Sequence, residues 1–170
     1  ASGAVDTTGP TNAVAAGDNI SAKQVRRAVT ELRARNALPR RGELFWAGIH
    51  PRVSADLREE SGAGSWRVPH EYNANTNIWA GEIGTFEGAF YVETNRMYSA
   101  NDGTTAQKVY RTIFAGAQGL AEAVAEEPHT VIGPVTDKLN RFRPIGWYGV
   151  LGWARYREAC LQRLESAATS

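Results

Sequence analysis

The chain has 170 residues, with 19 lysines and arginines against 18 aspartates and glutamates, which gives a formal net charge of +1. This length suits one domain or a core with one sizeable insertion, and the near-zero charge gives no bulk electrostatic sign of a nucleic-acid or membrane-binding protein. The single cysteine, Cys160, excludes an internal disulfide framework and a cysteine-rich metal site, and it favours synthesis in a reducing compartment. No apolar run approaches the roughly 20 residues that span a bilayer, so we expect a soluble protein.

Residues 1–19 are rich in Ala, Gly, Thr, Asp and Asn and show no apolar periodicity, which predicts an extended arm or linker. They have neither a basic start nor a hydrophobic core, so they do not form a signal peptide. The chain also begins without a methionine, which favours processing or a segment of a longer chain.

A long helix is predicted from Ser21 to about Asn36. Ser21 suits the N-cap position, Gln24 completes a capping box, and an apolar stripe follows at helical spacing. The segment 23–41 holds seven basic residues and one acid, Glu31, so it carries nearly all of the positive excess. A solvated helix face explains this charge most simply, and phosphate contact or pairing with an acidic neighbouring subunit are the alternatives.

The apolar run at 44–49 predicts a buried strand, and a second helix is predicted from about Ser54 to Glu60 with Ser54 as its cap. His50 lies between them, at a strand-to-helix turn of the kind that holds catalytic residues in many α/β enzymes. A nucleophile triad needs a serine or cysteine with a base in reach, and the sequence has neither a G-x-S-x-G elbow nor a Cys-His signature. We therefore interpret His50 as an architectural residue.

The other candidate metal-binding and phosphate-binding residues also lack the further residues that such sites require. His70 and His129 lie outside any zinc-binding spacing, and Gly81, Gly84 and Gly88 match neither phosphate-binding glycine pattern. We predict no catalytic residue, no cofactor and no metal site.

A loop is predicted over 61–77, where Trp66 and Tyr72 stand among small and polar residues and are expected to anchor on this subunit or on a neighbour. A one-turn helix is predicted near 78–80. Alternating apolar residues then predict one strand over 85–95.

The last third of the chain mixes strand and helix signals. We predict a strand over 109–116, a short helix over 117–126 and a brief β segment over 129–135. The tail, 142–167, is open between a helix and long twisted strands, because its leucines suit a helix while its glycines and aromatics suit strands. The order of these elements predicts an α+β protein.

The order of several short segments along the chain matches the order in a known protein family. The long helix is followed by "GIHPRVSADLRE", "IWAGEIGTFEGAFYVETNRM", "VYRTIFAGAQGLAEAV" and "PIGWYGVLGWARYREACLQRLES". This order, over about residues 20–166, resembles the major capsid proteins of tailed bacteriophages, and the closest type is similar to the shell protein of the podophage N4. The resemblance implies the Hong Kong phage-type capsid fold, which herpesviruses share.

The resemblance also implies a division of the chain. Residues 1–19 would be an arm or linker, 20–53 the peripheral domain with its spine helix and strand, 54–134 an inserted axial domain, and 135–170 a return to the peripheral domain as strands. His50 would then mark the turn into the first axial helix. Two departures stand out: little chain precedes the spine helix, so a truncated or partial shell protein is expected, and no lysine matches a crosslinking motif.

The function implied is that of a major capsid protein, which forms rings of five and six subunits and closes them into an icosahedral head around double-stranded DNA. Its partners would be further copies of itself, minor capsid or decoration proteins and the packaged DNA, with no membrane, and its location the virion after assembly in the host cytoplasm. The expected subunit-interface residues are Trp66, Arg67, Tyr72, Arg26 and Arg33.

Two other classes of function are alternatives. A small nucleic-acid-binding module would use the basic segment 23–41 and would lose affinity steeply with salt. A hydrolase built around His50 would lose its activity when His50 is replaced by alanine.

Overall fold

The structure, a computed structural model, describes residues 5–6, 13–61, 82–139 and 141–169. The chain divides into two compact units, one of residues Ala1–Gly119 and Arg157–Ser170 and the other of residues Leu120–Tyr156. Strands predominate in the described part of the chain, where two α-helices accompany them, so the α+β prediction agrees with the structure.

The first unit is built on a seven-stranded sheet with the order β1-β9-β6-β2-β4-β3, and β5 pairs with β6. Its strands are β1 (Val5–Asp6), β2 (Phe45–Ile49), β3 (Glu82–Phe86), β4 (Ala89–Glu93), β5 (Ser99–Ala100), β6 (Val109–Ala115) and β9 (Leu161–Ser166). β2 and β4 are parallel, and the other paired neighbours are antiparallel. Short 3-10 turns lie at Thr104–Ala106 and Glu158–Cys160.

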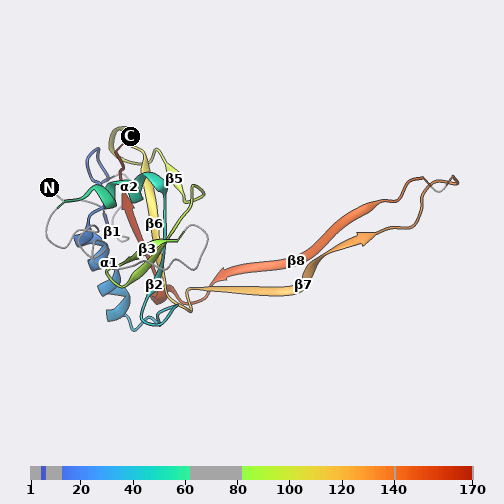
Figure 1. Ribbon diagram of the computed structural model, residues 1–170, viewed down its shortest axis with the longest axis horizontal. Coiled ribbons are helices and arrows are strands. Elements are labelled where there is room, and N and C mark those ends of the chain that lie inside the picture. Colours follow the sequence, from blue (N-terminus) through green and yellow to red (C-terminus); the bar gives the residue numbers. More distant parts are fainter. Residues whose placement is uncertain (1–4, 7–12, 62–81, 140, 170) are drawn as a thin grey trace. The chain divides into compact units, whose positions relative to one another are not determined.

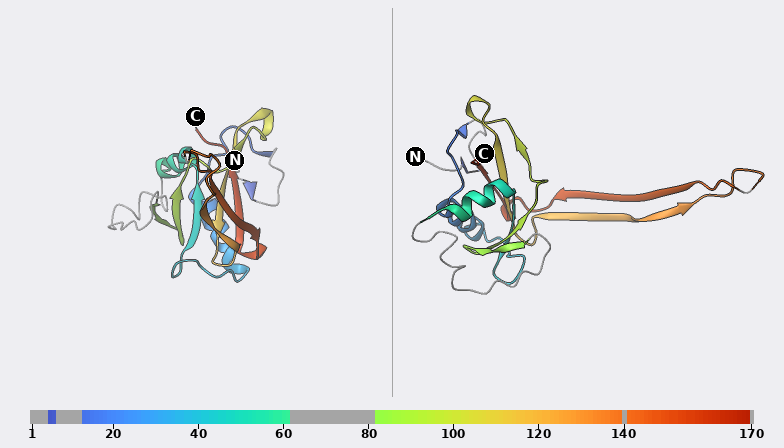
Figure 2. Two further views of the ribbon diagram at one scale, coloured as in Figure 1. Left: turned by 90° about the vertical axis from the view of Figure 1, so that its right-hand side faces the viewer. Right: turned by 45° about the horizontal axis from the view of Figure 1, so that its top comes forward.

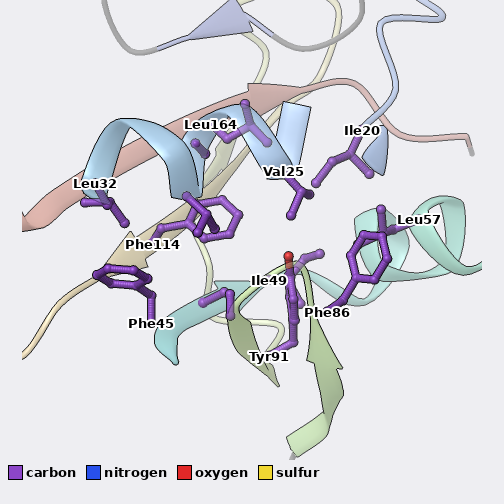
Figure 3. Close-up of a cluster of buried hydrophobic side chains, with 14 of the residues drawn as sticks. Ile20, Val25, Leu32, Phe45, Ile49, Leu57, Phe86, Tyr91, Phe114 and Leu164 are labelled. Carbon is purple, nitrogen blue, oxygen red and sulfur yellow. The ribbon is translucent and has the colours of Figure 1, made fainter. Parts of the chain in front are cut away.

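Two helices, α1 (Ala22–Ala34) and α2 (Pro51–Glu59), cover one face of this sheet (Figure 1). The core lies between them and the sheet, where side chains from both helices and from five strands form one buried cluster (Figure 3). Its labelled members are Ile20, Val25, Leu32, Phe45, Ile49, Leu57, Phe86, Tyr91, Phe114 and Leu164. The alternation of strand side chains explains why Phe45 and Ile49 of β2 face this core while Trp46 faces away from it.

The predicted first helix is confirmed. Gln24 Oε1 accepts a hydrogen bond from the backbone N–H of Ser21 at 2.7 Å, as the capping-box pattern predicts. Glu60, at the end of α2, accepts a further bond from the backbone N–H of Ala22 at 2.7 Å. This carboxylate satisfies one donor of the first turn of α1 and lies at the positive end of the helix dipole.

The second helix begins three residues earlier than predicted. His50 is its N-cap and Pro51 its first residue, a position that proline favours because its missing N–H costs nothing there. Ser54 is therefore not the cap: it lies within α2, is fully buried, and donates from its hydroxyl to Glu93 Oε2 at 2.5 Å.

The single strand predicted over 85–95 is wrong in one respect, because the chain reverses within it. Glu87 and Gly88 adopt positive φ values of 49° and 82°, and Phe86 pairs with Ala89 across them. Two central residues with positive φ form the tight turn that matches the twist of an antiparallel hairpin. Alternation continues on both sides of such a short turn, which is why the apolar pattern did not mark it.

The N-terminal segment is more than an arm. β1 pairs with β9, Val14 is fully buried in a small cluster with Val109 and Ala167, and Asn19 forms an isolated bridge with Ala167. The described part of this segment therefore packs on the first unit.

The second unit is a long hairpin of β7 (Leu120–Ile132) and β8 (Ile145–Arg155), whose strands run side by side in the right-hand view of Figure 2. The helix predicted over 117–126 is wrong, since most of this segment belongs to β7. The open choice for the tail is settled in favour of strands, β8 and β9. Intrinsic helix propensity is a weak prior, and pairing with the aromatic strand β8 overrides it here.

The predicted domain boundaries do not coincide with the two compact units. The boundary at 134 falls between β7 and β8, and the boundary at 53 separates β2 from β4 and β6, its partners in one sheet. The peripheral and axial assignments stay a prediction. The loop predicted over 61–77 and the turn near 78–80 lie, but for residue 61, outside the described residues.

Candidate assembly surfaces

His50 sits at a structural junction, as predicted. Its Nδ1 accepts a hydrogen bond from the backbone N–H of Arg52 at 3.3 Å, which satisfies a free donor of the first turn of α2. The ring also lies 4.7 Å, centroid to centroid, from that of Tyr110 on β6. A histidine used in this way orients a helix.

The surroundings of His50 favour its neutral form. Desolvation by burial lowers its pKa from the ordinary value of 6.5, and the positive charges of Lys108 and Arg52 lower the pKa further, against an opposing effect of Glu93. The neutral ring is also the form whose Nδ1 can accept the hydrogen bond from Arg52 N–H, so electrostatics and capping both favour the neutral histidine.

The basic segment 23–41 is partly neutralised within the chain. Arg26 forms an ion pair of 2.6 Å with Glu87 at the β3–β4 turn. Arg35 donates to Gln162 Oε1 at 3.1 Å, and the guanidinium of Arg41 lies 5.2 Å from the centre of the Phe90 ring.

Arg33, one of the residues predicted at a subunit interface, approaches the same turn as Arg26. Its guanidinium lies 2.7 Å from the place that a Cβ on Gly88 would occupy. The structure therefore brings Arg26 and Arg33 together on α1 over one turn of their own chain. Trp66, Arg67 and Tyr72 lie outside the described residues.

A second group of charges lies across β6 and β9. Glu165 is 1% exposed, and its Oε1 lies 2.9 Å from Arg111 Nε and 3.1 Å from Arg163 Nε. Asp102 lies 3.8 Å from Arg111, whose guanidinium is stacked 3.9 Å from the centre of the Tyr98 ring. This network joins two central strands and compensates a buried carboxylate, which is a structural role.

The described residues contain no group of three or more His, Cys, Asp or Glu side chains that could hold a metal ion. Within the same described ranges, no helix is long and apolar enough to cross a membrane.

The hairpin β7–β8 carries an unusual surface. Most large apolar side chains that are exposed in the described part of the chain belong to it rather than to the seven-stranded unit. These residues are Leu120, Val124, Val131, Ile132, Leu139, Phe142, Ile145, Trp147, Tyr148, Val150, Trp153 and Tyr156. Soluble proteins rarely expose so large a contiguous apolar area unless a partner covers it.

The strand period sorts these side chains onto two faces. On β8, which is continuous, Ile145, Trp147, Leu151 and Trp153 lie on one face, and Tyr148 and Val150 lie on the other. The partners on β7 follow from the register: Ile132 is opposite Ile145, Val124 opposite Leu151 and Glu122 opposite Trp153. Trp153 Nε1 donates to Glu122 Oε1 at 3.1 Å, which agrees with this assignment.

We call the first of these faces the tryptophan face. It consists of Leu120, Val124, Ile132, Ile145, Trp147, Leu151 and Trp153.

The sequence contains a signal for these strands in the spacing of its glycines. Gly146, Gly149 and Gly152 interrupt the aromatic stretch, and glycine every third residue is unfavourable for a helix. The Gly149 position also faces Pro128 on β7, where an added Cβ would lie 2.9 Å from the proline Cα. A proline within 117–132 was a further sign against a helix there.

The fold and its surfaces define a strand-rich α+β protein with a large uncovered apolar ribbon and a buried charge network, which is typical of a protein that associates. Residues 7–162 match the family model described as phage capsid protein. The chain therefore belongs to the phage capsid protein family, and membership indicates a structural rather than an enzymatic role in the virion. No curated protein matches the chain.

Two solved structures share the fold. The capsid of Ralstonia phage GP4 has 18% sequence identity and a TM-score of 0.67, over 94% of this chain and 50% of that chain. The cyanophage Pam1 capsid asymmetric unit has 17% identity and a TM-score of 0.71, over 93% of this chain and 49% of that chain. The chain thus spans about half the length of the solved capsid chains it resembles.

Proposed function

We propose that this chain forms part of a phage major capsid protein, whose copies assemble into rings of five and six subunits and close into an icosahedral head around double-stranded DNA. The observation that carries the proposal is the family match over residues 7–162, together with similarity to two phage capsid structures. Assembly would take place in the host cytoplasm, with minor capsid or decoration proteins as further partners.

Physical features of the chain support an associating role. The tryptophan face is an uncovered apolar surface of the kind that interfaces bury at their centres. Closed shells need contacts that recur under symmetry, and large complementary interfaces supply their free energy of assembly.

The finer assignments belong to the same proposal. They are the Hong Kong phage-type fold, the N4-like subtype, the division into peripheral and axial domains, and subunit contacts at Trp66, Arg67, Tyr72, Arg26 and Arg33. The TM-scores of 0.67 and 0.71 support the fold assignment at the level of a shared architecture.

Electron microscopy of the protein from its native source tests the proposal. The fraction that elutes in the void volume of a sizing column is imaged in negative stain, and uniform icosahedral particles that contain this chain are expected. A chain that occurs only as a monomer or dimer, with no particles in the preparation, would refute the proposal.

The alternative function is a nucleic-acid-binding module that uses segment 23–41. The ion pair of Arg26 and the hydrogen bond of Arg35 weigh against it, because these side chains are engaged within their own chain. The measurement that separates the two is DNA affinity against salt, since neutralising six or more phosphates would lower it by orders of magnitude between about 50 and 200 mM salt.

A further inference from the structure

The positive charge of the chain is concentrated on helix α1 and the turn that follows it. Segment 23–41 has seven basic residues and one acid, whereas the whole chain has a net charge of +1, so the remaining residues together are net negative. One side of α1 packs on the sheet and the other side is exposed (Figure 1). A negatively charged partner would therefore be attracted to the exposed side of this helix.

The helical repeat divides the exposed side of α1 into a central stripe and two flanks. Val25, Val29 and Leu32 are buried against the sheet, and at 3.6 residues per turn four exposed residues lie opposite them. We call these four residues the crest of α1: Lys23, Arg27, Thr30 and Ala34. The crest carries two positive charges and no negative charge.

Groups of the same chain engage the flanks of α1. On one flank Arg26 pairs with Glu87 at 2.6 Å, and the guanidinium of Arg33 lies against the same β3–β4 turn. On the other flank Arg35 lies 3.7 Å from Glu31, the one acid of segment 23–41. The flank charges are thus used largely within the chain, and the crest is the part of α1 that points directly away from the sheet.

A second copy of the chain is a poor match for this crest. Helix α2 has two acids and two arginines, and residues 120–156 of the hairpin have four acids and four bases. Neither element is therefore a net acidic surface. On the sheet, Glu87 and Glu93 already have partners in Arg26 and Ser54.

Duplex DNA matches the crest in charge. It carries one negative charge per about 1.7 Å of its axis, so it presents phosphates to a cation wherever the cation lies along it. Lys23 and Arg27 are one turn apart, about 6 Å along α1, and lysine and arginine are common phosphate-binding side chains. Contacts to the phosphate backbone carry no sequence information, which suits a shell that encloses DNA of any sequence.

We propose that the crest of α1 contacts the phosphate backbone of the packaged duplex DNA, and that this face of the first unit lines the inside of the assembled head. The inference rests on the proposed function, because a closed shell holds DNA against the same face of its copies. About two phosphates are neutralised per copy. A single copy therefore binds weakly, and the many copies of a shell act together.

Chemical labelling of lysines in native particles tests this contact. The chain has three lysines, Lys23, Lys108 and Lys138, and all three are exposed in the structure. Acetic anhydride, a small amine-reactive reagent, is applied to DNA-filled particles and to particles that have released their DNA, and mass spectrometry gives the rate at each lysine. We expect Lys23 to react more slowly in the filled particles by about threefold or more, while the rates at Lys108 and Lys138 are the same in both.

The other labelling outcomes overturn the contact and leave the capsid role intact. Equal protection of Lys23 in filled and emptied particles would mean that a neighbouring subunit covers the crest. Equal reactivity of Lys23 in both would mean that neither DNA nor protein covers it. A native preparation without particles would refute the capsid role, and the contact with it.

The affinity of the full chain for duplex DNA gives a second measurement. Lys23→Gln with Arg27→Gln removes both crest charges at exposed positions, and glutamine is a good helix former, so the circular dichroism spectrum is expected to stay unchanged. The slope of the logarithm of affinity against the logarithm of salt concentration is expected to fall in magnitude by about 1.8, the value for two phosphates.

A matched control separates the crest from general charge effects. Lys138→Gln with Arg143→Gln removes the same charge from exposed positions between β7 and β8 and is expected to keep the wild-type slope. Equal slopes for the crest variant and the wild type, or an equal loss in the control, overturn the contact. A wild-type slope near about 5, the value for six phosphates, would overturn its restriction to the crest and favour the nucleic-acid-binding module.

Discussion

At the scale of single residues, the sheet depends on one buried carboxylate. Glu165 is 1% exposed and lies between Arg111 and Arg163, so its removal leaves two guanidinium groups without their shared partner. We expect Glu165→Gln to lower the free energy of unfolding by about 2–4 kcal/mol, at or below the cost of breaking a fully buried pair, because the two arginines stay partly exposed. Denaturant unfolding measures this difference.

The matched control at the edge of the same network is Asp102→Asn. Asp102 lies 3.8 Å from Arg111 and its side chain is 40% exposed, so water screens the interaction. Its loss is expected to cost less than about 1 kcal/mol. Equal effects of the two substitutions would show that burial does not set the strength of this network.

The N-cap of α2 predicts a dependence of stability on pH. The folded chain lowers the pKa of His50, so below the ordinary value of 6.5 the unfolded chain binds a proton that the folded chain resists. The stabilising contribution is therefore complete above pH 6.5 and is lost as the pH falls from that value through the lower pKa of the folded chain. Lys108, Arg52 and Glu93 are the charged groups that act on the ring.

The variant His50→Asn isolates this contribution. Asparagine is also a good N-cap but does not titrate. We expect the difference in unfolding free energy between wild type and variant to change between pH 7 and 5.5, with the wild type losing more. Parallel pH profiles of the two proteins would contradict the role assigned to His50.

At the scale of elements, the β3–β4 turn beneath α1 depends on glycine at one position. Gly88 has a φ of +82°, and an added Cβ would lie 3.3 Å from Val29 Cγ1 as well as close to the mobile end of Arg33. We expect Gly88→Ala to lower the free energy of unfolding by about 1–2 kcal/mol, mainly through backbone strain. The control is Gly152→Ala, since nothing lies within 4 Å of the added Cβ and a change below about 1 kcal/mol is expected.

Local signals predicted some elements well and others poorly. α1 and β2 were predictable because Ser21, Gln24 and a short run of buried apolar residues act over a few neighbours in the chain. β7 was not, because its residues 120–126 have helical propensity and become a strand only through pairing with β8, some 20 to 35 residues away. The cap of α2 was misplaced because Ser54 looks like a cap, whereas tertiary burial directs its hydroxyl to Glu93.

The candidate surface was predictable only in part. The basic helix and the structural role of His50 were predictable, since composition and the absence of catalytic motifs can be read from the sequence alone. The tryptophan face was not visible, because which side chains share it depends on the register of β7 and β8.

At the scale of the whole chain, the two compact units differ in how their backbone is protected. Six of the seven strands of the first unit form a continuous ladder, and a buried cluster lies on one face of that sheet. β7 and β8 pair only with each other within the described residues, and a two-stranded ribbon is marginally stable in water by itself. Local stability therefore ought to be lowest in residues 120–156 when the chain is dissociated.

Limited proteolysis measures this difference. Trypsin has targets in the hairpin at Lys138, Arg141 and Arg155, whereas Pro144 blocks cleavage after Arg143. We expect mass spectrometry of the dissociated chain to find the first cleavages at these targets rather than at arginines of the first unit such as Arg111. In assembled particles the same sites are expected to be protected by at least tenfold in rate, because association would cover the ribbon and suppress its local opening. Equal cleavage rates in the two states would mean that the hairpin stays uncovered after assembly, and its apolar side chains would then need an explanation other than subunit contact.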